Sequence, residues 1–561
     1  MSSLVIIIIP VLILIIFLEG SLREKRSKEE FRKELKENYG KQKDKALGKD
    51  DLLRISGYHH KCMENAPEGF CIDEITWNDL SMDDIFMRLN SCYSSLGEEE
   101  LYHRLHCPIL GPDEEYDHFC KMREYFEEHE QERIKLQEIF NNIGINRKTS
   151  ITKIYDYVSV LKPESNVSHY IMILFVICSV ISIFIIPGIG VLLFLAMLIV
   201  SIGSYLKTKK VIEPLIVTFN YTGRMIVACE KISEFAPEIL VKDIAKLKEY
   251  EKPLRGLLNK TLWISSGAVS MDNPVMLLLE YIKMVFHIDL IMINDLTVLL
   301  KEHIGEIDGI RYILGSIDAA IAVGSYKNSL YNVCIPEFIK DNEVAIDIED
   351  CIHPLVAAPV SNSIKVKGAV LVTGSNASGK STFLKTLAVS ALFAQTLGFV
   401  PSKTYRASRF KIFTSMALND SISNGESYFI VEIKSIKRII DAGFDAPVLC
   451  CIDEVLRGTN TVERIAASTQ ILRSLVRPGY IVFAATHDIE LTKLLKEDYI
   501  NYHFEEVVSG NDIKFNYLLQ EGSARTRNAI KLLKIMGYEE NIIHDADDMV
   551  ERFINTGNWS L

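Results

Sequence analysis

A glycine-rich string at positions 374–382 holds the residues with the most specific chemistry in this 561-residue chain. It reads, in order, Gly374, Ser375, Asn376, Ala377, Ser378, Gly379, Lys380, Ser381 and Thr382, and positions 374–381 fit the spacing G-x-x-x-x-G-K-[ST]. In this pattern main-chain N–H groups close around phosphate oxygens, the lysine contacts the β and γ phosphates, and the final hydroxyl binds Mg²⁺. The string therefore predicts a site that binds and hydrolyses ATP with Mg²⁺.

Two acidic residues and a histidine lie where two further strands are expected to end. Asp453 and Glu454 follow the apolar run 448–452, and His487 closely follows the apolar run 481–485. Asp453 is predicted to hold Mg²⁺ through water, Glu454 to polarise the attacking water, and His487 to sense the γ phosphate. The alternatives are a solvated loop for the acidic pair and a structural role for the histidine. A buried strand about seventy residues after the loop favours the catalytic interpretation.

The elements that must position these residues change character near residue 336. From there short β-rich runs, among them 369–373, 448–452 and 480–485, alternate with helical stretches. Such alternation predicts a mostly parallel sheet with helices on its faces. Upstream, residues 20–168 and 207–335 are helical in pattern, for example over 83–92 and 113–142. We expect an α/β P-loop ATPase domain at the carboxyl end, preceded by an all-α region.

Two apolar segments account for a mean hydropathy of +0.13, which is high for a soluble protein. Residues 4–18 carry no charge, and residues 170–206 run 37 positions without an acidic or basic side chain, broken by Pro187-Gly188-Ile189-Gly190. Since about 20 apolar residues cross a bilayer, we expect an amino-terminal anchor and a hairpin of two spans of roughly 17 residues. The alternatives are a secretory signal, without its usual basic start and cleavage site, and a buried core helix pair.

Basic residues beside both apolar segments predict a single topology. Residues 21–50 contain eleven Lys and Arg against seven acidic residues, and 207–210 reads Lys-Thr-Lys-Lys. Because basic flanks stay in the cytoplasm, the amino terminus should lie outside and both soluble regions inside. This predicts a multi-pass membrane protein with three spans. Residues 21–50 could instead bind anionic lipid or DNA.

Charge and cysteine content limit the remaining possibilities. The net charge of −12 argues against a broad basic face for nucleic acid, although a local basic channel stays open. The eleven cysteines contain no C-x-x-C pair. We expect them to be reduced cytosolic thiols that mostly fill the core.

Four strings, in chain order, resemble the ATPase domain of the MutS DNA mismatch repair family: TGSNASGKSTFLK, SNGESYFIVEIKSI, CIDEVLRGTNT and ATHDIEL. The segment 351–356, with His353 and Pro354, resembles the lead-in to that domain. Upstream, 95–108, Arg123 and 317–320 resemble the family's core, or lever, domain. The likeness covers most of 80–555, densely after 350 and thinly between 130 and 300.

The resemblance implies roles for individual residues. It matches Asn376, Lys380, Ser381 and Thr382 to the nucleotide loop, Asp453 and Glu454 to the Mg²⁺ and water-activating pair, and His487 to the strand-end histidine. Ser427 matches the serine that reaches the partner's γ phosphate in MutS dimers, which implies a homodimer with shared ATP sites. Residues 522–552 are similar to the segment that helps MutS dimerise. The sequence departs from the family at Glu426, usually Arg, and at Tyr428, which replaces Thr.

We expect the family's mismatch-reading and connector domains to be missing, and Phe126-Glu-Glu and Phe504-Glu-Glu match the mismatch wedge in letters only. The leading hypothesis is a membrane-anchored MutS-family ATPase that binds DNA in a repair-like process and moves lever arms. The alternatives are an ATP-driven membrane switch that acts on a protein without DNA, and a scaffold that only binds ATP. The expected order is an anchor (1–19), a helical region (20–168), a membrane hairpin (169–206), a helical lever (207–335), the ATPase domain (336–520) and a dimerisation segment (521–561).

Overall fold

The computed structural model describes residues 19, 22–23, 25–42, 46–64, 69–147, 149–161, 165–257, 281–340, 343–375, 378–416, 428–443, 445–457, 459–509, 512–523, 530, 533 and 536–556. The predicted anchor at 4–18 lies outside these residues. The chain divides into two compact units. The helical unit comprises Met1–Ala66, Arg88–His103 and Asp117–Ser329, and the sheet unit comprises Pro67–Met87, Arg104–Tyr116 and Leu330–Leu561.

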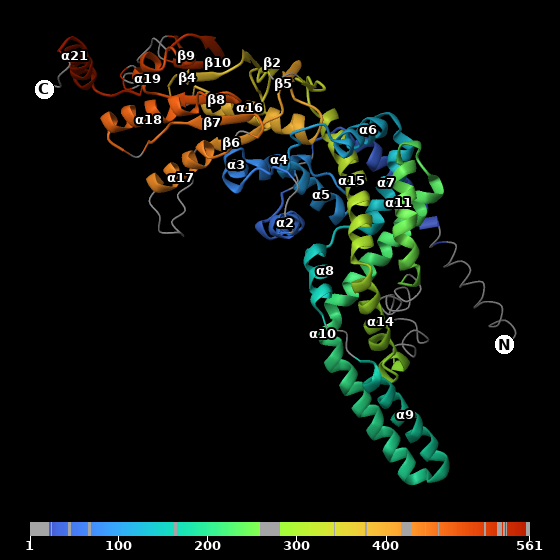
Figure 1. Ribbon diagram of the computed structural model, residues 1–561. Helices are drawn as coiled ribbons and strands as arrows, with labels where there is room; N and C mark the ends of the chain where they lie inside the picture. Colours follow the sequence, from blue (N-terminus) through green and yellow to red (C-terminus); the bar gives the residue numbers. More distant parts are fainter. Residues whose placement is uncertain are drawn as a thin grey trace. The chain divides into compact units, whose positions relative to one another are not determined.

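The helical unit is built mainly from long helices, shown in blue to yellow-green in Figure 1. Its principal helices are α2 (Lys49–Glu64), α7 (Glu130–Ile143), α8 (Ile151–Val160), α9 (Val167–Ile185), α10 (Pro187–Phe235), α11 (Val241–Glu251), α14 (Ile288–Glu302) and α15 (Ile304–Asn328). Short 3₁₀ turns occupy Glu238–Leu240 and Lys252–Leu254. Helices α4 (Met82–Leu89), α5 (Ser95–His106) and α6 (Glu114–Glu128) have residues in both units. The stretch predicted as one long helical run over 113–142 is therefore two helices, broken at His129.

Two strings that resemble the MutS core domain, although far apart in sequence, pack directly on each other in the helical unit. The buried carboxylate of Asp318 on α15 accepts hydrogen bonds from the backbone N–H of Ser94 at 2.9 Å and from its hydroxyl at 2.6 Å. A Cβ atom at Gly97 would overlap the Asp318 side chain. Gly97 is thus the residue that lets the start of α5 approach α15.

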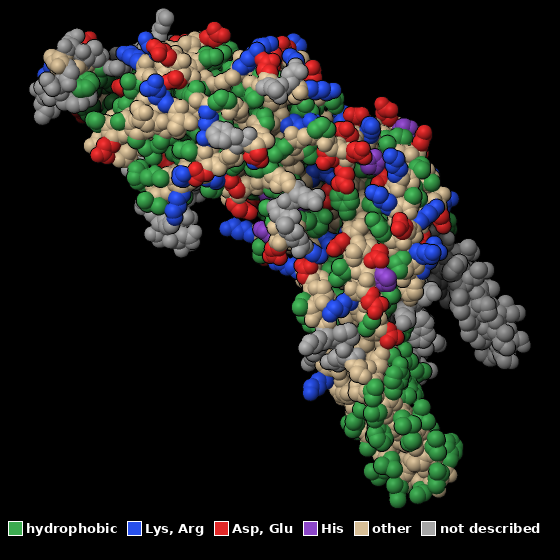
Figure 2. Space-filling view, in the orientation of Figure 1, with side chains coloured by type: hydrophobic (Ala, Val, Ile, Leu, Met, Phe, Trp, Pro, Cys, Tyr) green, Lys and Arg blue, Asp and Glu red, His purple; other side chains and the backbone are tan. Residues whose placement is uncertain are grey.

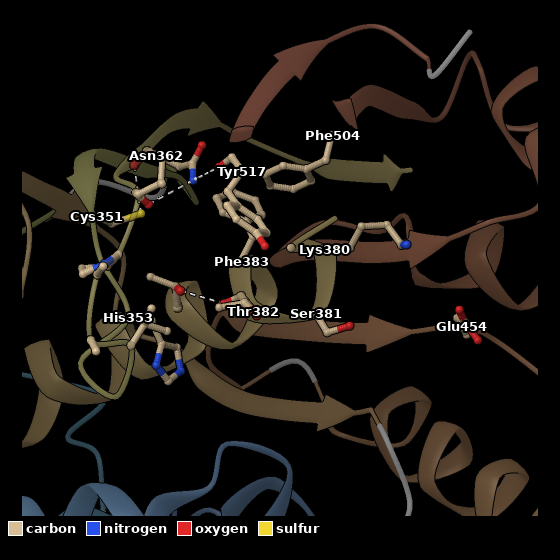
Figure 3. Close-up of a pocket in the computed structure, with 17 residues that line it drawn as sticks. Cys351, His353, Asn362, Lys380, Ser381, Thr382, Phe383, Glu454, Phe504 and Tyr517 are labelled. Carbon is tan, nitrogen blue, oxygen red and sulfur yellow. Dashed lines mark hydrogen bonds between the residues drawn. The ribbon is translucent and has the colours of Figure 1, made fainter. Parts of the chain in front are cut away.

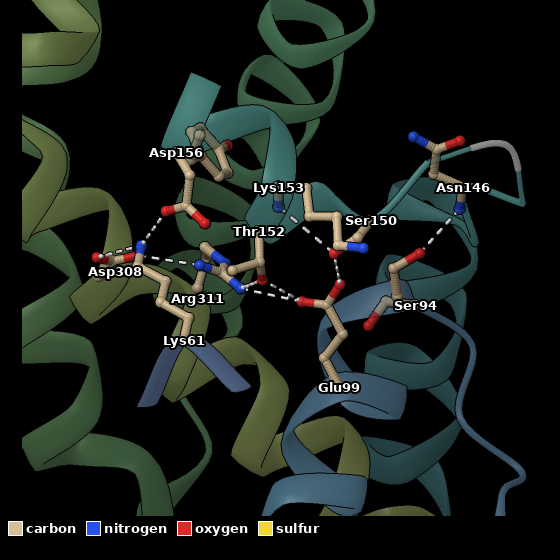
Figure 4. Close-up of polar contacts among 12 residues, drawn as sticks. Lys61, Ser94, Glu99, Asn146, Ser150, Thr152, Lys153, Asp156, Asp308 and Arg311 are labelled. Atoms are coloured by element: carbon tan, nitrogen blue, oxygen red, sulfur yellow. Dashed lines mark hydrogen bonds and ion pairs between the residues drawn. The ribbon is translucent and has the colours of Figure 1, made fainter. Parts of the chain in front are cut away.

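Ion pairs join four segments of the helical unit (Figure 4). Buried Arg311 on α15 donates to buried Glu99 on α5 at 2.9 Å and to the hydroxyl of Thr152 on α8. Lys61 on α2 forms partly exposed pairs with Asp156 at 3.1 Å and with Asp308 at 3.5 Å. Because a buried charge without a partner is costly, the Arg311–Glu99 pair fixes how α5, α8 and α15 pack, and the Lys61 pairs add a weaker link to α2.

Helices α9 and α10 form the predicted hairpin. Pro187, which needs no hydrogen-bonded N–H in the first turn, begins α10. A Cβ at Gly190 would lie 2.5 Å from backbone atoms of Ser182 and Ile183, so the glycine allows the two helices to touch. Val167–Ile185 and Pro187–Lys209 have the length and composition to cross a membrane, and only 17% of each apolar window is buried. Hydrophobic side chains cover this hairpin in Figure 2.

Polar contacts join α9 and α10 to the start of α14. His169 and His287 face each other with their Nδ1 atoms 2.9 Å apart, and Nε2 of His287 lies 3.0 Å from the carbonyl oxygen of Ser201. The hydroxyl of Tyr205 donates to Asp289 at 3.1 Å. From this point α10 continues without a break to Phe235, so one helix belongs both to the apolar hairpin and to the bundle.

The sheet unit contains a six-stranded sheet in the order β10-β9-β4-β8-β7-β6. Its strands are β4 (Ala369–Thr373), β6 (Lys411–Ser415), β7 (Val448–Asp453), β8 (Tyr480–Thr486), β9 (Tyr499–Ser509) and β10 (Asp512–Glu521). All neighbours pair in parallel except β9 and β10. The three runs predicted as strands from their apolar, β-rich composition are thus confirmed as β4, β7 and β8.

Helices cover this sheet: α16 (Lys380–Thr396), α17 (Tyr428–Ile440), α18 (Thr461–Leu475) and α19 (Ile489–Leu494), with α21 (Glu540–Thr556) further along the chain (Figure 1). Side chains of α17 and α18, such as Ile439 and Leu472, pack against Cys450 and Val482 in one apolar cluster. A second sheet, in the order β1-β5-β2-β3, uses Glu337–Phe338, Thr404–Ala407, Ile346–Cys351 and Asn362–Val366. This second sheet was not predicted.

Residues 67–87 and 104–116 pack with the strands, although their sequence is helical in pattern. Asp73 caps α3 (Glu74–Asp79) by accepting the N–H of Thr76. Asp79 at the end of α3 accepts from the Thr414 hydroxyl at 2.7 Å. Cys71 and Cys107 form a disulfide. The expectation that the cysteines are reduced thiols is therefore wrong for these two, because the fold brings together residues 36 apart in sequence.

Candidate nucleotide-binding site

The strand register brings the predicted site residues to one edge of the six-stranded sheet. Thr373 on β4 lies opposite Thr486 on β8, and Asp453 on β7 lies opposite Ala485 on β8. The three strands are parallel, so their carboxyl ends share an edge. The loop that follows β4, the acidic pair that ends β7 and His487 after β8 therefore meet where ligands bind in open parallel sheets.

Two glycines shape the phosphate loop. Gly374 has φ +146°, and a Cβ there would lie 2.8 Å from the carbonyl oxygen of Phe504. Gly379 has φ +106°, and a Cβ there would approach the ring of Tyr517 to 3.2 Å. Both positions require a residue without a side chain, because the conformation is strained for other residues and the space is already filled. Asn376 and Ala377, between them, lie outside the described residues.

Lys380 begins α16 and turns its ammonium back into the loop. Its Nζ atom donates to the carbonyl oxygens of Gly374 at 2.8 Å and Ser375 at 2.7 Å. Burial lowers the pKa of Lys380, while the nearby carboxylates of Asp453 and Glu454 act in the opposite direction. The loop carbonyls thus hold a cation at the start of a helix whose N–H groups also attract anions.

The two predicted metal ligands are in direct contact. The hydroxyl of Ser381 donates to Oδ2 of Asp453. Burial raises the pKa of Asp453, and the Ser381 hydrogen bond works against that rise. A hydroxyl and a carboxylate at the mouth of a phosphate loop are the hard oxygen donors that Mg²⁺ takes together with substrate phosphates, so the donor set fits this ion.

Glu454 has charged partners on both carboxylate oxygens. Its Oε1 lies 3.1 Å from Nδ1 of His487, and its Oε2 lies 3.1 Å from Nε of Arg457. The hydrogen bond from His487 lowers the pKa of Glu454, and the same bond raises the pKa of His487. Both shifts favour a carboxylate paired with an imidazolium. The turn that follows His487 is held by Arg464 on α18, which donates two hydrogen bonds to Asp488.

A cavity of about 640 Å³ opens beside the loop (Figure 3). Its lining comprises Cys351, His353, residues 356–360, Asn362, residues 379–383, Thr386, Glu454, Phe504 and Tyr517. The amide of Asn362 donates to the carbonyl oxygen of Tyr517 at 3.0 Å and accepts the N–H of Leu519 at 2.8 Å. These bonds hold the part of β10 around Tyr517 against Asn362, the first residue of β3. The cavity has the size of a small-molecule site, and its walls combine apolar and polar side chains.

The sequence did not identify Asn362, Phe504, Tyr517 or Arg457 as site residues. Tyr517 is in a bulge of β10 with φ +54°, and neither the bulge nor the pairing with β9 has a local signal in the sequence. His353 was noticed only through the family resemblance. Ser427 and Glu426 lie outside the described residues, so the role predicted for Ser427 stays a prediction.

A phosphate loop between a buried strand and a helix, with an acidic pair and a histidine at the same sheet edge, defines the sheet unit as a P-loop ATPase domain. Residues 370–554 match the family model of MutS domain V. The match supports a MutS-type ATPase domain in this part of the chain, as the motif strings predicted.

Similar proteins match the same part of the chain. A DNA mismatch repair protein MutS from Thermotoga maritima is 27% identical over 331 residues, covering 56% of this chain and 40% of that relative. The MutS of Thermotoga sp. (strain RQ2) is 31% identical over 244 residues, covering 41% of this chain and 30% of the relative. The MutS of Natronomonas pharaonis is 30% identical over 233 residues, covering 39% and 26%. This chain thus spans less than half the length of these curated relatives.

Proposed function

We propose that the chain is a Mg²⁺-dependent ATPase, with the phosphates of ATP in the loop 374–381 and its adenosine in the adjoining cavity. The observation that supports this most directly is the meeting of Lys380, the Ser381–Asp453 pair and Glu454 at one sheet edge. Lys380 neutralises the phosphates, and Glu454 orients and polarises water. Ser381 and Asp453 would hold Mg²⁺, which when bound would neutralise charge that develops on the phosphates.

Turnover of ATP by purified protein tests this proposal. Lys380→Ala should bring turnover to background and weaken ATP binding, because the phosphates lose their buried cation. Lys403→Ala removes a surface lysine whose side chain is 61% exposed and should leave both unchanged. If Lys380→Ala hydrolyses ATP as fast as the parent, the assignment of the site is wrong.

The same proposal includes a homodimer whose ATP sites are completed across the interface by Ser427, as the family resemblance implies. Mixing two inactive variants, Lys380→Ala and Ser427→Ala, tests this directly. In a mixed dimer, one of the two sites combines the intact lysine of the Ser427→Ala chain with the intact serine of the Lys380→Ala chain. After random exchange about half of the dimers are mixed, so about a quarter of the sites, and of the parental activity, should be restored in a closed two-fold dimer. No restoration after subunit exchange would mean that each site is made by a single chain.

We propose DNA as the partner on the basis of the family resemblance, because the matched relatives are named DNA mismatch repair proteins. Binding to duplex, branched and mismatched DNA over a series of salt concentrations tests it. Contacts with phosphates make affinity fall steeply as salt rises. Weak binding that does not depend on salt would favour the alternative, an ATP-driven switch that acts on a protein partner at the membrane.

The proposal places the apolar hairpin of α9 and α10 in a lipid bilayer, with the ATPase domain on the cytoplasmic side. Its support is the exposure of large apolar side chains over the whole hairpin, for example Phe184 at 84% and Ile199 at 73%. A soluble protein rarely leaves so continuous an apolar surface in water. Because α10 continues into the bundle, ATP-driven movement of the bundle would reach the bilayer through one helix.

A further inference from the structure

Helix α17 is joined to the turn after the catalytic strand by a buried carboxylate. Glu432 on α17 is only 4% exposed. Its Oε1 accepts the backbone N–H of Arg457 at 3.2 Å, and the backbone N–H of Leu456 also favours the ionised carboxylate. Leu456 and Arg457 belong to the turn that follows Glu454, so a helix from a different part of the domain holds this turn.

The turn requires such an anchor because its backbone is strained. Glu454 and Leu456 each have φ +58°, in the left-handed region that residues with a side chain rarely adopt. This conformation is unfavourable for a residue with a side chain and persists only where the surroundings impose it. The carboxylate of Glu432 supplies that constraint through its bond to the main chain of Arg457.

The same turn determines where the carboxylate of Glu454 points. The backbone of Arg457 is held by Glu432, and the Arg457 guanidinium reaches back to Oε2 of Glu454 at 3.1 Å. A chain of contacts therefore runs from α17 through Glu432 and Arg457 to Glu454. Burial raises the pKa of Glu432, and the backbone N–H groups of Arg457 and Leu456 oppose that rise without cancelling it.

We propose that Glu432 is a positioning residue for ATP hydrolysis, which fixes the turn 455–457 and thereby aims Glu454 at the attacking water. This inference rests on the proposed ATPase function.

Steady-state and binding measurements on Glu432 variants test the proposal. Glu432→Ala and the shorter Glu432→Asp should lower kcat by about tenfold or more, because Glu454 is no longer aimed, while the Kd for a fluorescent ATP analogue changes less than about threefold. Glu432→Gln should recover most of the rate, because its amide oxygen still accepts the N–H of Arg457. The control Lys437→Ala, on the same helix with a side chain 66% exposed, should match the parent.

Hydrogen exchange at Leu456 and Arg457 gives a readout that does not need turnover. These amides should exchange faster in Glu432→Ala and Glu432→Asp than in the parent, Glu432→Gln or Lys437→Ala. If the parent does not hydrolyse ATP, the proposed function fails, while exchange at the two amides still decides whether Glu432 holds the turn. Unchanged exchange in Glu432→Asp overturns the positioning role. Faster exchange with a parental kcat would make Glu432 a structural anchor only, which also overturns it.

Discussion

Glu454 is oriented by its protein partners before any substrate is considered. One oxygen faces the His487 imidazole, and the other faces the Arg457 guanidinium. A carboxylate in such a setting is held ionised, as the proposed role of polarising water requires. Glu454 also has a left-handed φ of +58°, and its side chain lines the cavity beside the loop.

The His487–Glu454 pair predicts a limited pH range of added stability. The bond to Glu454 raises the His487 pKa above its ordinary 6.5, and the bond to His487 lowers the Glu454 pKa below its ordinary 4.5. The contribution of the pair to the free energy of unfolding is fully present between pH 4.5 and pH 6.5, the two ordinary pKa values. It is lost as pH rises through the raised His487 pKa and as pH falls through the lowered Glu454 pKa.

Urea unfolding at a series of pH values, with parent and His487→Gln compared, measures this contribution. The difference between them should be largest between the ordinary pKa values of 4.5 and 6.5 and should shrink above and below. His544→Gln, which changes a histidine with a 75% exposed side chain, is the control. A difference between parent and His487→Gln that is constant over pH would contradict the ion pair.

Tyr517 is predicted to contact the adenine base. Its ring lies beside Gly379 at the wall of the cavity, and Asn362 fixes its backbone. Stacking of a base on an aromatic ring is worth roughly 1–3 kcal/mol, so Tyr517→Ala should weaken ATP binding about fivefold or more. Tyr517→Phe keeps the ring and should bind nearly as the parent does. Titration calorimetry with ATP and with inorganic triphosphate separates base from phosphate contacts, and equal losses for both ligands would contradict the assignment.

The residues that the sequence located are those that local pattern determines. Lys380 and Ser381 follow from the loop spacing, and Asp453 and Glu454 follow from the end of an apolar strand. Tyr517 and Arg457 could not be found in this way, because a β-bulge brings one to the cavity and a strained turn brings the other to Glu454. Both depend on non-local hydrogen bonds, which a single sequence does not reveal.

At the scale of elements, the hairpin was predictable and the continuation of its second helix was not. The apolar run and Pro187 determine two helices and the position of the turn. The basic residues at 207–210 look like the end of a span, yet α10 passes through them to Phe235. Charge indicates where a helix leaves an apolar environment, and it carries no information on where the helix itself stops.

Close contact between α9 and α10 predicts a strong effect of a small substitution. Gly190→Ala puts a Cβ 2.5 Å from backbone atoms of Ser182 and Ile183, and backbone cannot move aside as a side chain can. The two helices must separate, so thermal unfolding of the detergent-solubilised protein should shift several degrees lower. Gly188→Ala is the matched control, because a Cβ there meets no atom within 4 Å. Equal transitions for both variants would show that the helices are not in contact at Gly190.

At the scale of the whole molecule, the chain order and the units do not coincide. Residues 67–87 and 104–116 join the sheet unit through contacts such as the bond from the Thr414 hydroxyl to Asp79, across 335 positions of sequence. Sequence pattern identified the helices of these segments, but it could not tell which core they join. The ATPase domain was recognisable because its strands and motifs are local. The division into units depends on pairings between distant residues.

The placement of the hairpin in a bilayer yields a prediction that compares two equally exposed apolar residues. Ile199, near the middle of the apolar part of α10, is 73% exposed, and Val462 on α18 is 77% exposed. A fluorophore on Ile199→Cys, in protein reconstituted into vesicles and with Cys178 replaced by serine, should be quenched by nitroxide groups on lipid tails and shielded from aqueous iodide. The same fluorophore on Val462→Cys should behave in the opposite way.

Leaving the apolar surface of the hairpin in water costs about 25 cal/mol for each Å², so the hydrophobic effect strongly favours its insertion into the bilayer. Iodide quenching at residue 199 as strong as at residue 462 would mean that the hairpin stays outside the bilayer, and the membrane part of the proposed function would then be wrong while the ATPase site stood unaffected.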